Sequence, residues 1–384
     1  MNRTKSGNLT FTILSISLLT VMAGAAMAPA LGVIRGHFAE QSGLTVQLIV
    51  SLPALFIIIT NFFFPALCRL MRTRTMAVLG LCMYIAFGAG AFFARDILTV
   101  LAMRALLGVS VGMIMPLSTG LLAYYFPPEE QARLMGLSAF MNQTGGVIAT
   151  FLSGFLCAFG WNFSFLVYLL GVIALVLVVA FLPNDRLAAG KRRDRPAASL
   201  LRFAPSVTGM FLLMILFFIF PTNFAITSLS NGSLTPDVIT LIMVGLDVVA
   251  AAVGLVFGRM MKSFPRAMKY MAPVGFTLGF MCFSAGTELF WLLAGSVLIG
   301  LANGVGVPYL NTVASVKGGK DAAAAVMPLL SAAMFLGQFV SPLIVSPCAR
   351  LFTGVTAPYK VGVVIGIVFI VQAFCSRKYQ SVSV

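Results

Sequence analysis

The stretch that decides the fold is Arg104-Ala105-Leu106-Leu107-Gly108-Val109-Ser110-Val111-Gly112, which continues to Pro116 within a long apolar run. A second apolar run carries the same spacing 192 residues later, at Gly300, Gly304 and Pro308. The same offset pairs two further positions, Pro29 with Pro221 and Gly145 with Gly337. Glycine permits close helix packing and proline alters helix geometry, so agreement at these positions indicates an internal duplication.

The composition places the whole chain in a membrane. Of its 384 residues, 60% are hydrophobic and 9% are charged, whereas soluble domains carry about 25% charged residues. A hydrocarbon core of about 30 Å needs about 20 apolar residues per helix, and such runs recur from end to end. Because these runs are continuously apolar rather than alternating, they predict helices instead of a barrel. We expect twelve spans, at residues 9–34, 44–67, 76–94, 97–126, 134–157, 163–183, 205–228, 238–257, 270–287, 289–316, 323–348 and 358–376.

The spans fall into two sets of six on either side of one polar, basic segment. The sequence therefore predicts an all-α membrane protein whose twelve transmembrane helices form two pseudo-symmetric six-helix bundles. We expect an N-terminal bundle at residues 1–183, a cytoplasmic basic linker at 184–203 and a C-terminal bundle at 204–384. Two parallel halves with a substrate path at their interface match a known transporter design.

The formal charge of +15 reflects topology rather than nucleic-acid binding. Twenty of the 25 Lys and Arg residues fall in segments on the same side as the N-terminus, and one, Arg104, lies within a span. Four lie on the opposite side: Arg35, Arg95, Arg350 and Lys360. By the positive-inside rule both termini are cytoplasmic, and we expect a multi-pass protein of a bacterial inner membrane, with some attraction to anionic lipid.

Two features near the N-terminus allow other interpretations. The first span could be a cleaved signal peptide, because Arg3 and Lys5 precede an apolar stretch that ends in Ala26-Met27-Ala28. Its partner in the second half favours a retained helix instead. The lone His37 falls just past this span, where a solvated loop residue is the simpler interpretation and a pH sensor the alternative.

No cofactor or metal is expected. The six cysteines are scattered without metal-ligand spacing, and most fall in or at the edge of apolar spans. They are typical of small buried hydrophobic residues.

The stretch from Arg104 to Gly112 resembles the fourth-helix motif of the major facilitator superfamily, an intramembrane Arg followed by spaced glycines. The next loop, Phe126-Pro127-Pro128-Glu129-Glu130-Gln131-Ala132-Arg133 leading to Gly136, is similar to that superfamily's Pro, Glu, Arg, Gly pattern. Gly160-Trp161 before the sixth span also fits. The resemblance covers essentially the whole chain. It implies that helices one, four, seven and ten surround a central path, with two, five, eight and eleven flanking it.

Three segments depart from that family pattern. The loop from Pro65 to Arg74 keeps basic residues but lacks the Asp and both glycines of the family signature. Its counterpart from Gly254 to Lys262 is also degenerate. Met141-Asn142 stands where drug antiporters carry Gly-Pro in the fifth helix. These departures argue against a gating latch that uses the missing carboxylate, and they weaken an assignment as a multidrug exporter.

Two charges lie well inside spans, Arg104 in the fourth and Asp247 in the eighth. Each costs roughly 2.5 to 3.5 kcal/mol on insertion scales, so each should face a cavity or a partner. Arg104 can hold an anionic substrate group or tune a proton site; alternatively it snorkels and pairs with helix-end carbonyls. Asp247 suits reversible protonation or binding of a substrate cation; alternatively it only stabilises helix packing. Neither charge is repeated at the offset of 192, and whether the two pair stays open.

Polar side chains elsewhere in the spans are further candidates for a substrate cavity. Such groups fix the orientation of a solute in an otherwise apolar pocket, and helix-to-helix hydrogen bonding is the alternative for each. The candidates are Asn142, Gln143, Asn223, Asn303, Tyr309, Asn311 and Gln338.

These observations predict a monomeric secondary transporter that moves a small organic solute by alternating access, coupled to protons. The 34 Phe and 21 Met residues favour efflux of amphipathic compounds, whereas Arg104 favours uptake of a small organic anion. A nucleotide-driven pump would need a phosphate-binding loop, which the sequence lacks. An integral membrane enzyme is the alternative from another class. With one His and ten acidic residues, the sequence offers no cluster of catalytic groups, so we expect no enzyme.

Overall fold

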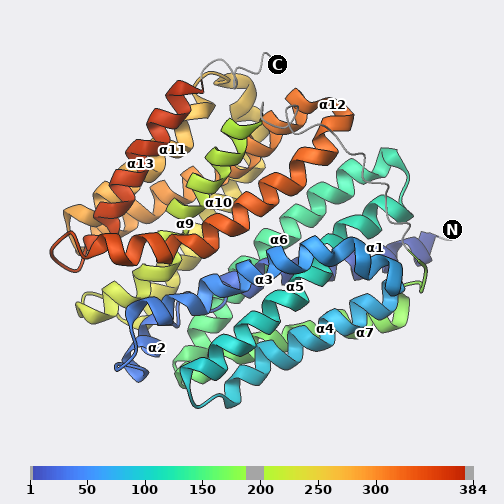
Figure 1. Cartoon of the computed structure of the whole chain (residues 1–384), viewed down its shortest axis with the longest axis horizontal. Coiled ribbons are helices and arrows are strands. Elements are labelled where there is room, and N and C mark those ends of the chain that lie inside the picture. The colour runs from blue at the N-terminus through green and yellow to red at the C-terminus, as the bar shows by residue number, and fades with distance from the viewer. Residues whose placement is uncertain (1–2, 187–202, 377–384) are drawn as a thin grey trace. The chain divides into compact units, whose positions relative to one another are not determined.

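The computed structural model describes residues 3–186 and 203–376, and every regular element in these ranges is a helix (Figure 1). The predicted all-α class is confirmed. The chain divides into two compact units, Met1–Arg192 and Arg193–Val384. The predicted linker at 184–203 spans this division, and its residues 187–202 lie outside the described part of the chain.

Each predicted span overlaps one or two of these helices. Ten segments of the described chain are long and apolar enough to cross a membrane, and α6 and α11 correspond to the other two predicted spans. The N-terminal unit contains α1 (Arg3–Ala25), α2 (Leu31–His37), α3 (Gly43–Leu70), α4 (Thr73–Gly90), η1 (Ala91–Phe93), α5 (Ile97–Tyr125), α6 (Pro128–Cys157), η2 (Trp161–Leu170) and α7 (Gly171–Phe181). The C-terminal unit contains α9 (Ala204–Ser230), α10 (Pro236–Ser263), α11 (Met268–Ala285), α12 (Leu289–Ala349) and α13 (Ala357–Cys375).

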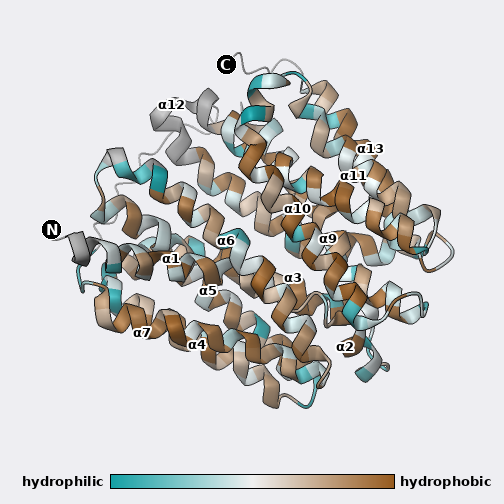
Figure 2. Cartoon of the chain, turned by 180° about the vertical axis from the view of Figure 1, so that it is seen from behind, coloured by the Kyte–Doolittle hydropathy of each residue, from teal (hydrophilic) through white to brown (hydrophobic). Residues whose placement is uncertain are grey.

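Apolar side chains cover the outside of the helices as well as their cores. Figure 2 shows hydrophobic residues along most of each helix and hydrophilic ones mainly near helix ends and loops. Phe62, Val176, Leu255 and Val368 are all more than half exposed. Such exposure is expected when the surrounding solvent is lipid.

Two predicted spans differ from the helices observed. The span at 9–34 is interrupted at residues 26–30, because Pro29 has no N–H to donate and disfavours helical geometry in the residue before it. The span at 163–183 begins as the 3₁₀ helix η2, ten residues long, before continuing as α7. Runs of this length are uncommon for 3₁₀ geometry.

The element α12 contains two membrane spans that lie side by side. It is 61 residues long and holds the candidate spans Leu289–Ala314 and Val326–Ala349. Gly306 and Gly337 pack against consecutive residues of α9, Leu213 and Met214. A straight helix would separate these two glycines by about 46 Å. The chain therefore reverses direction within α12, as the separate spans at 289–316 and 323–348 predict.

Glycines bring the second and fourth membrane helices of each unit into main-chain contact. A Cβ added to Gly112 of α5 would lie 3.1 Å from the carbonyl oxygen of Ile57 in α3. The equivalent Cβ on Gly304 of α12 would lie 2.6 Å from the carbonyl oxygen of Ala250 in α10. The duplication read from the sequence is thus a repeat of packing contacts.

The single offset of 192 is wrong for the first two helices of each unit. Gly145 in α6 faces the carbonyl of Leu18 in α1, and Gly337 faces that of Phe211 in α9. The contacted residues Leu18 and Phe211 are 193 positions apart in the sequence, although the two glycines are 192 apart. Gly112 and Gly304 show the same difference, because they contact Ile57 and Ala250. At an offset of 193, Pro29 aligns with Thr222 instead of Pro221. The chain is also not helical at Pro29, whereas α9 continues through Pro221 to Ser230.

The start of α5 is held by its own first turn. The carboxylate of Asp96 accepts hydrogen bonds from the backbone N–H of Thr99 at 2.8 Å and from its hydroxyl at 2.6 Å. These bonds favour the charged form and hold the pKa of Asp96 below its ordinary value. The cap places Arg104 two turns into the helix.

Adding a methyl group at Gly112 is expected to destabilise the protein, whereas the same change at Gly120 in the same helix is not. Gly112→Ala would place its Cβ 2.6 Å from the Cβ of Thr60, and such overpacking costs about 1–3 kcal/mol. Gly120 has no atom within 4 Å of the added position, so Gly120→Ala should gain about 0.5–1 kcal/mol. Unfolding of the purified variants in detergent measures both, and equal stabilities would contradict the packing.

Candidate functional site

Arg104 lies entirely inside the N-terminal unit, with 0% of its surface exposed. Its Nε donates to the carbonyl of Ile49 at 2.6 Å, its Nη1 to the hydroxyl of Tyr168 at 2.5 Å, and its Nη2 to the carbonyl of Ala23 at 2.5 Å. These partners belong to α3, η2 and α1. One side chain of α5 therefore joins three other elements through neutral oxygens.

The two carbonyls bound by Arg104 lack a helical donor for identifiable reasons. The carbonyl of Ile49 would ordinarily accept from the residue four positions later, which is Pro53 and has no N–H. Ala23 lies in the last turn of α1, where carbonyls have no partner within the helix. An unsatisfied backbone group in hydrocarbon costs several kcal/mol. Arg104 thus supplies donors at two places where the backbone needs them.

A glycine one turn later brings Arg104 within reach of α3. A Cβ on Gly108 would lie 2.9 Å from the Cα of Pro53, so only glycine allows this approach. Arg104 and Gly108 are four residues apart, as are Ile49 and Pro53, which gives the parallel helices α5 and α3 a matching register.

Two buried tyrosines complete this cluster, and sequence reasoning missed both. The rings of Tyr84 and Tyr168 meet edge to face at 5.5 Å. Tyr168 donates to the carbonyl of Ala23 at 3.2 Å, and Tyr84 donates to that of Leu19 at 3.2 Å. A buried tyrosine needs a partner for its hydroxyl. The available signal was a tyrosine inside the third and inside the sixth apolar span.

Asp247 lies near the middle of α10 in the C-terminal unit and is half-buried. The preceding residue, Leu246, faces α12, because its carbonyl oxygen would lie 2.8 Å from a Cβ on Gly300. Successive residues are about 100° apart around a helix. Asp247 is therefore turned away from the seam between α10 and α12. The partners recorded for Arg104 all belong to the other unit.

Asn142 takes part in a polar seam between α1 and α6. Its side-chain oxygen accepts a hydrogen bond from the hydroxyl of Thr20 at 3.0 Å. One turn away, the hydroxyls of Ser17 and Ser138 are 2.8 Å apart. The neighbouring Gln143 is exposed. Helix-to-helix bonding is the arrangement observed for Asn142.

Asn223 is buried beside Pro221 in α9 and binds its own helix. Its amide nitrogen donates to the carbonyl of Ile219 at 2.9 Å and to the hydroxyl of Thr222 at 3.0 Å. The carbonyl that lacks a helical donor because of Pro221 is that of Phe217, four residues earlier, so this bond to Ile219 does not replace the missing one.

The remaining candidates lie on α12 in different environments. The side-chain oxygen of Asn303 is buried and has no hydrogen-bond partner within the described residues. Tyr309 and Gln338 are buried, and Asn311 is half-buried. Of these, Asn303 has an acceptor in need of a donor, as a solute or water would supply.

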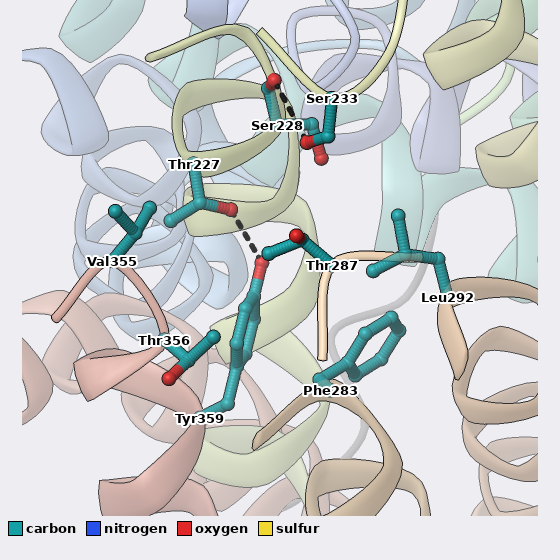
Figure 3. Close-up of a pocket in the computed structure, with 9 residues that line it drawn as sticks. All are labelled: Thr227, Ser228, Ser233, Phe283, Thr287, Leu292, Val355, Thr356 and Tyr359. Carbon is teal, nitrogen blue, oxygen red and sulfur yellow. Dashed lines mark hydrogen bonds between the residues drawn. The ribbon is translucent and has the colours of Figure 1, made fainter. Parts of the chain in front are cut away.

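A small pocket that the sequence did not indicate lies in the C-terminal unit (Figure 3). Its empty space of about 240 Å³ includes a part that is open to the surroundings. The hydroxyls of Thr227 and Tyr359 are 2.6 Å apart at its edge, and Phe283 forms part of its wall. Within the described part of the chain, no three His, Cys, Asp or Glu side chains lie close enough together to hold a metal ion.

Comparison with protein families identifies the surrounding architecture. The protein-family model described as "Major Facilitator Superfamily" matches residues 9–342 of this chain. A curated relative, the "Multidrug resistance protein B homolog" of Mycobacterium tuberculosis, is 35% identical over 115 residues, which are 29% of this chain and 21% of that protein. The "MFS antiporter QDR3" of Candida albicans is 26% identical over 113 residues, 29% of this chain and 16% of that protein. These matches span about a fifth of the relatives' own length.

Solved structures resemble the chain over nearly its whole length. A bacterial homologue of the human lysosomal transporter Spinster, in an inward-facing occupied form, gives a TM-score of 0.79 at 13% identity, with 99% of this chain and 97% of that chain covered. A D-xylose-proton symporter gives 0.74 at 14% identity, with 97% of each chain covered. At these identities the likeness concerns the fold alone.

The dependence of Arg104 on Pro53 can be measured by a double-mutant cycle. Arg104→Met leaves the Ile49 carbonyl without a donor, which costs about 1–3 kcal/mol. In a Pro53→Ala background the new N–H can bind that carbonyl. In that background, Arg104→Met should lower the free energy of unfolding by about 1 kcal/mol less than it does in the parent. A coupling of this size is expected for residues that share a partner.

Pro65→Ala provides the control, because Pro65 lies in the same helix as Pro53. The carbonyl four residues before Pro65 is that of Asn61, whereas Arg104 binds the carbonyl of Ile49. Unfolding free energies in detergent give the cycle. If Pro53→Ala and Pro65→Ala changed the effect of Arg104→Met equally, the freed carbonyl would not explain the arginine.

Proposed function

Because the chain belongs to the major facilitator superfamily, we propose that it is a secondary active transporter that exports a small organic solute by alternating access, driven by protons. Two observations support transport: the chain belongs to this superfamily, and its two helical units repeat the same glycine packing. The proposal places the protein in a bacterial inner membrane as a monomer with both termini cytoplasmic, on the basis of its charge distribution.

Asp247 carries the proposal of proton coupling. It is an acidic side chain near the middle of a membrane helix, and it is turned away from the seam with α12. An intramembrane carboxylate has a functional role by default, since its charge is expensive in hydrocarbon and reversible protonation removes that cost.

Export is favoured over uptake by two observations. The two curated relatives described above bear names that refer to drug resistance or antiport, although they match only part of this chain. In addition, the feature that favoured uptake of a small anion, Arg104, has no exposed surface and donates to three oxygens of its own unit. An anion would have to displace these oxygens to reach the guanidinium.

Flux into proteoliposomes with an imposed pH gradient tests the proposal directly. A panel of amphipathic cations, organic acids and sugars should reveal at least one solute whose movement depends on the gradient. If no solute moved in either direction and none raised the melting temperature, the transporter proposal would be overturned.

Asp247→Asn is expected to abolish flux driven by the pH gradient while leaving counterflow exchange of the same solute intact. The amide keeps the size and polarity of the carboxyl group but carries no titratable proton. Asp237→Asn is the matched control, because Asp237 is exposed in the first turn of the same helix, and this variant should behave like the parent. Unchanged gradient dependence in Asp247→Asn would exclude this residue as the proton site.

A further inference from the structure

A second small pocket in the C-terminal unit combines a cation with an unsatisfied acceptor. It lies among α9, α11, α12 and α13, and its empty space of about 250 Å³ includes a part that is open to the surroundings. Its polar lining comes from Lys269, Tyr309 and Gln372, set among apolar side chains such as Leu213 and Phe369. The space admits about one group the size of a water molecule.

Gln372 lines the pocket, and its amide group has a defined orientation. Its nitrogen donates to the carbonyl of Pro205 at 2.8 Å, which fixes which end of the amide is the donor. The oxygen at the other end is buried and has no hydrogen-bond partner within the described residues. Leaving such an acceptor unsatisfied costs about 1–3 kcal/mol. The pocket therefore favours an occupant that donates a hydrogen bond.

Lys269 determines the charge that this occupant can carry. Its Nζ is buried and lies 5.2 Å from the ring centroid of the adjacent Tyr270. A buried ammonium disfavours a second cation close by and favours an electronegative atom. A hydroxyl satisfies both requirements, because it donates to the Gln372 oxygen and presents its own oxygen to Lys269.

The chain segment that leads into Lys269 is strongly basic and carries an exposed aromatic ring. Arg259, Lys262 and Arg266 are exposed around the short turn between α10 and α11, and Phe264 in that turn is 62% exposed. The sequence holds no acidic residue between Asp247 and Glu288. Cations next to an aromatic side chain at the end of a membrane helix are typical of contacts with anionic lipid headgroups.

We propose that this end of the C-terminal unit is a binding site for an anionic phospholipid whose headgroup carries a hydroxyl, as phosphatidylglycerol does. The phosphate lies against the exposed cations Arg266 and Lys262, and a headgroup hydroxyl enters the pocket and donates to Gln372. Ethanolamine headgroups are disfavoured because their ammonium would approach Lys269. Soluble glycerol phosphate shares this chemistry, but the exposed Phe264 and the membrane helices favour the lipid as its source.

Competition between two lipids of equal charge tests the pocket. Phosphatidylmethanol carries the same phosphodiester charge as phosphatidylglycerol and lacks the hydroxyl. Native mass spectrometry of the purified protein should show binding of phosphatidylglycerol about fivefold tighter, the effect of one hydrogen bond. Equal binding of the two lipids would overturn the proposal, and this comparison needs no variant.

Two variants separate the pocket from the charged surface. Gln372→Leu should lower phosphatidylglycerol binding to the level of phosphatidylmethanol. Lys262→Gln, which alters the basic turn outside the pocket, should weaken both lipids alike, by about fivefold for one charge. If Gln372→Leu kept the preference, the pocket would hold only water. If soluble glycerol 3-phosphate displaced the lipid completely at equal concentration, the lipid would not be the ligand.

Discussion

A backbone carbonyl in hydrocarbon needs a hydrogen-bond donor, and in the N-terminal unit one guanidinium meets that need at two places. Pro53 removes the donor for Ile49, the end of α1 leaves Ala23 without one, and Arg104 binds both oxygens. The arrangement exists only because Gly108 lets α5 approach α3 closely. The intramembrane charge is therefore part of the bonding of the bundle, and its position determines how α1, α3, α5 and η2 fit together.

The C-terminal unit repeats the packing but not this solution. Ser296 occupies the place of Arg104 and donates to the carbonyl of Leu292 in its own helix at 2.7 Å. Leu246 occupies the place of Pro53, so no carbonyl is freed there. The interior is instead filled by aromatic rings, with Phe220 stacked on Phe224 at 4.6 Å. The proline and the arginine are found together in one unit and absent together from the other, because the first creates the need that the second meets.

Apolar run length predicted the fold class and the twelve spans, since the membrane imposes one length on every helix. The length of an apolar run does not show which side of a helix faces its neighbours, so contacts that depend on helix rotation could not be predicted. The partners of Tyr84 and Tyr168 follow from which side of each helix faces Arg104, and no local pattern encodes that direction. The offset of 193 between Ile57 and Ala250 emerged only from contacts, because glycine and proline matches align helices and say little about one-residue shifts between them.

The glycine contacts also have a mechanical consequence. At Gly108 and Gly304 the backbone of one helix lies directly against the backbone of another, at Pro53 and Ala250 respectively. A helix in such a pair cannot slide past its partner without a collision between backbones. Each of the helix pairs α3–α5 and α10–α12 should therefore move as one rigid unit. Relative motion of helices during transport would then occur at interfaces where flexible side chains separate the backbones.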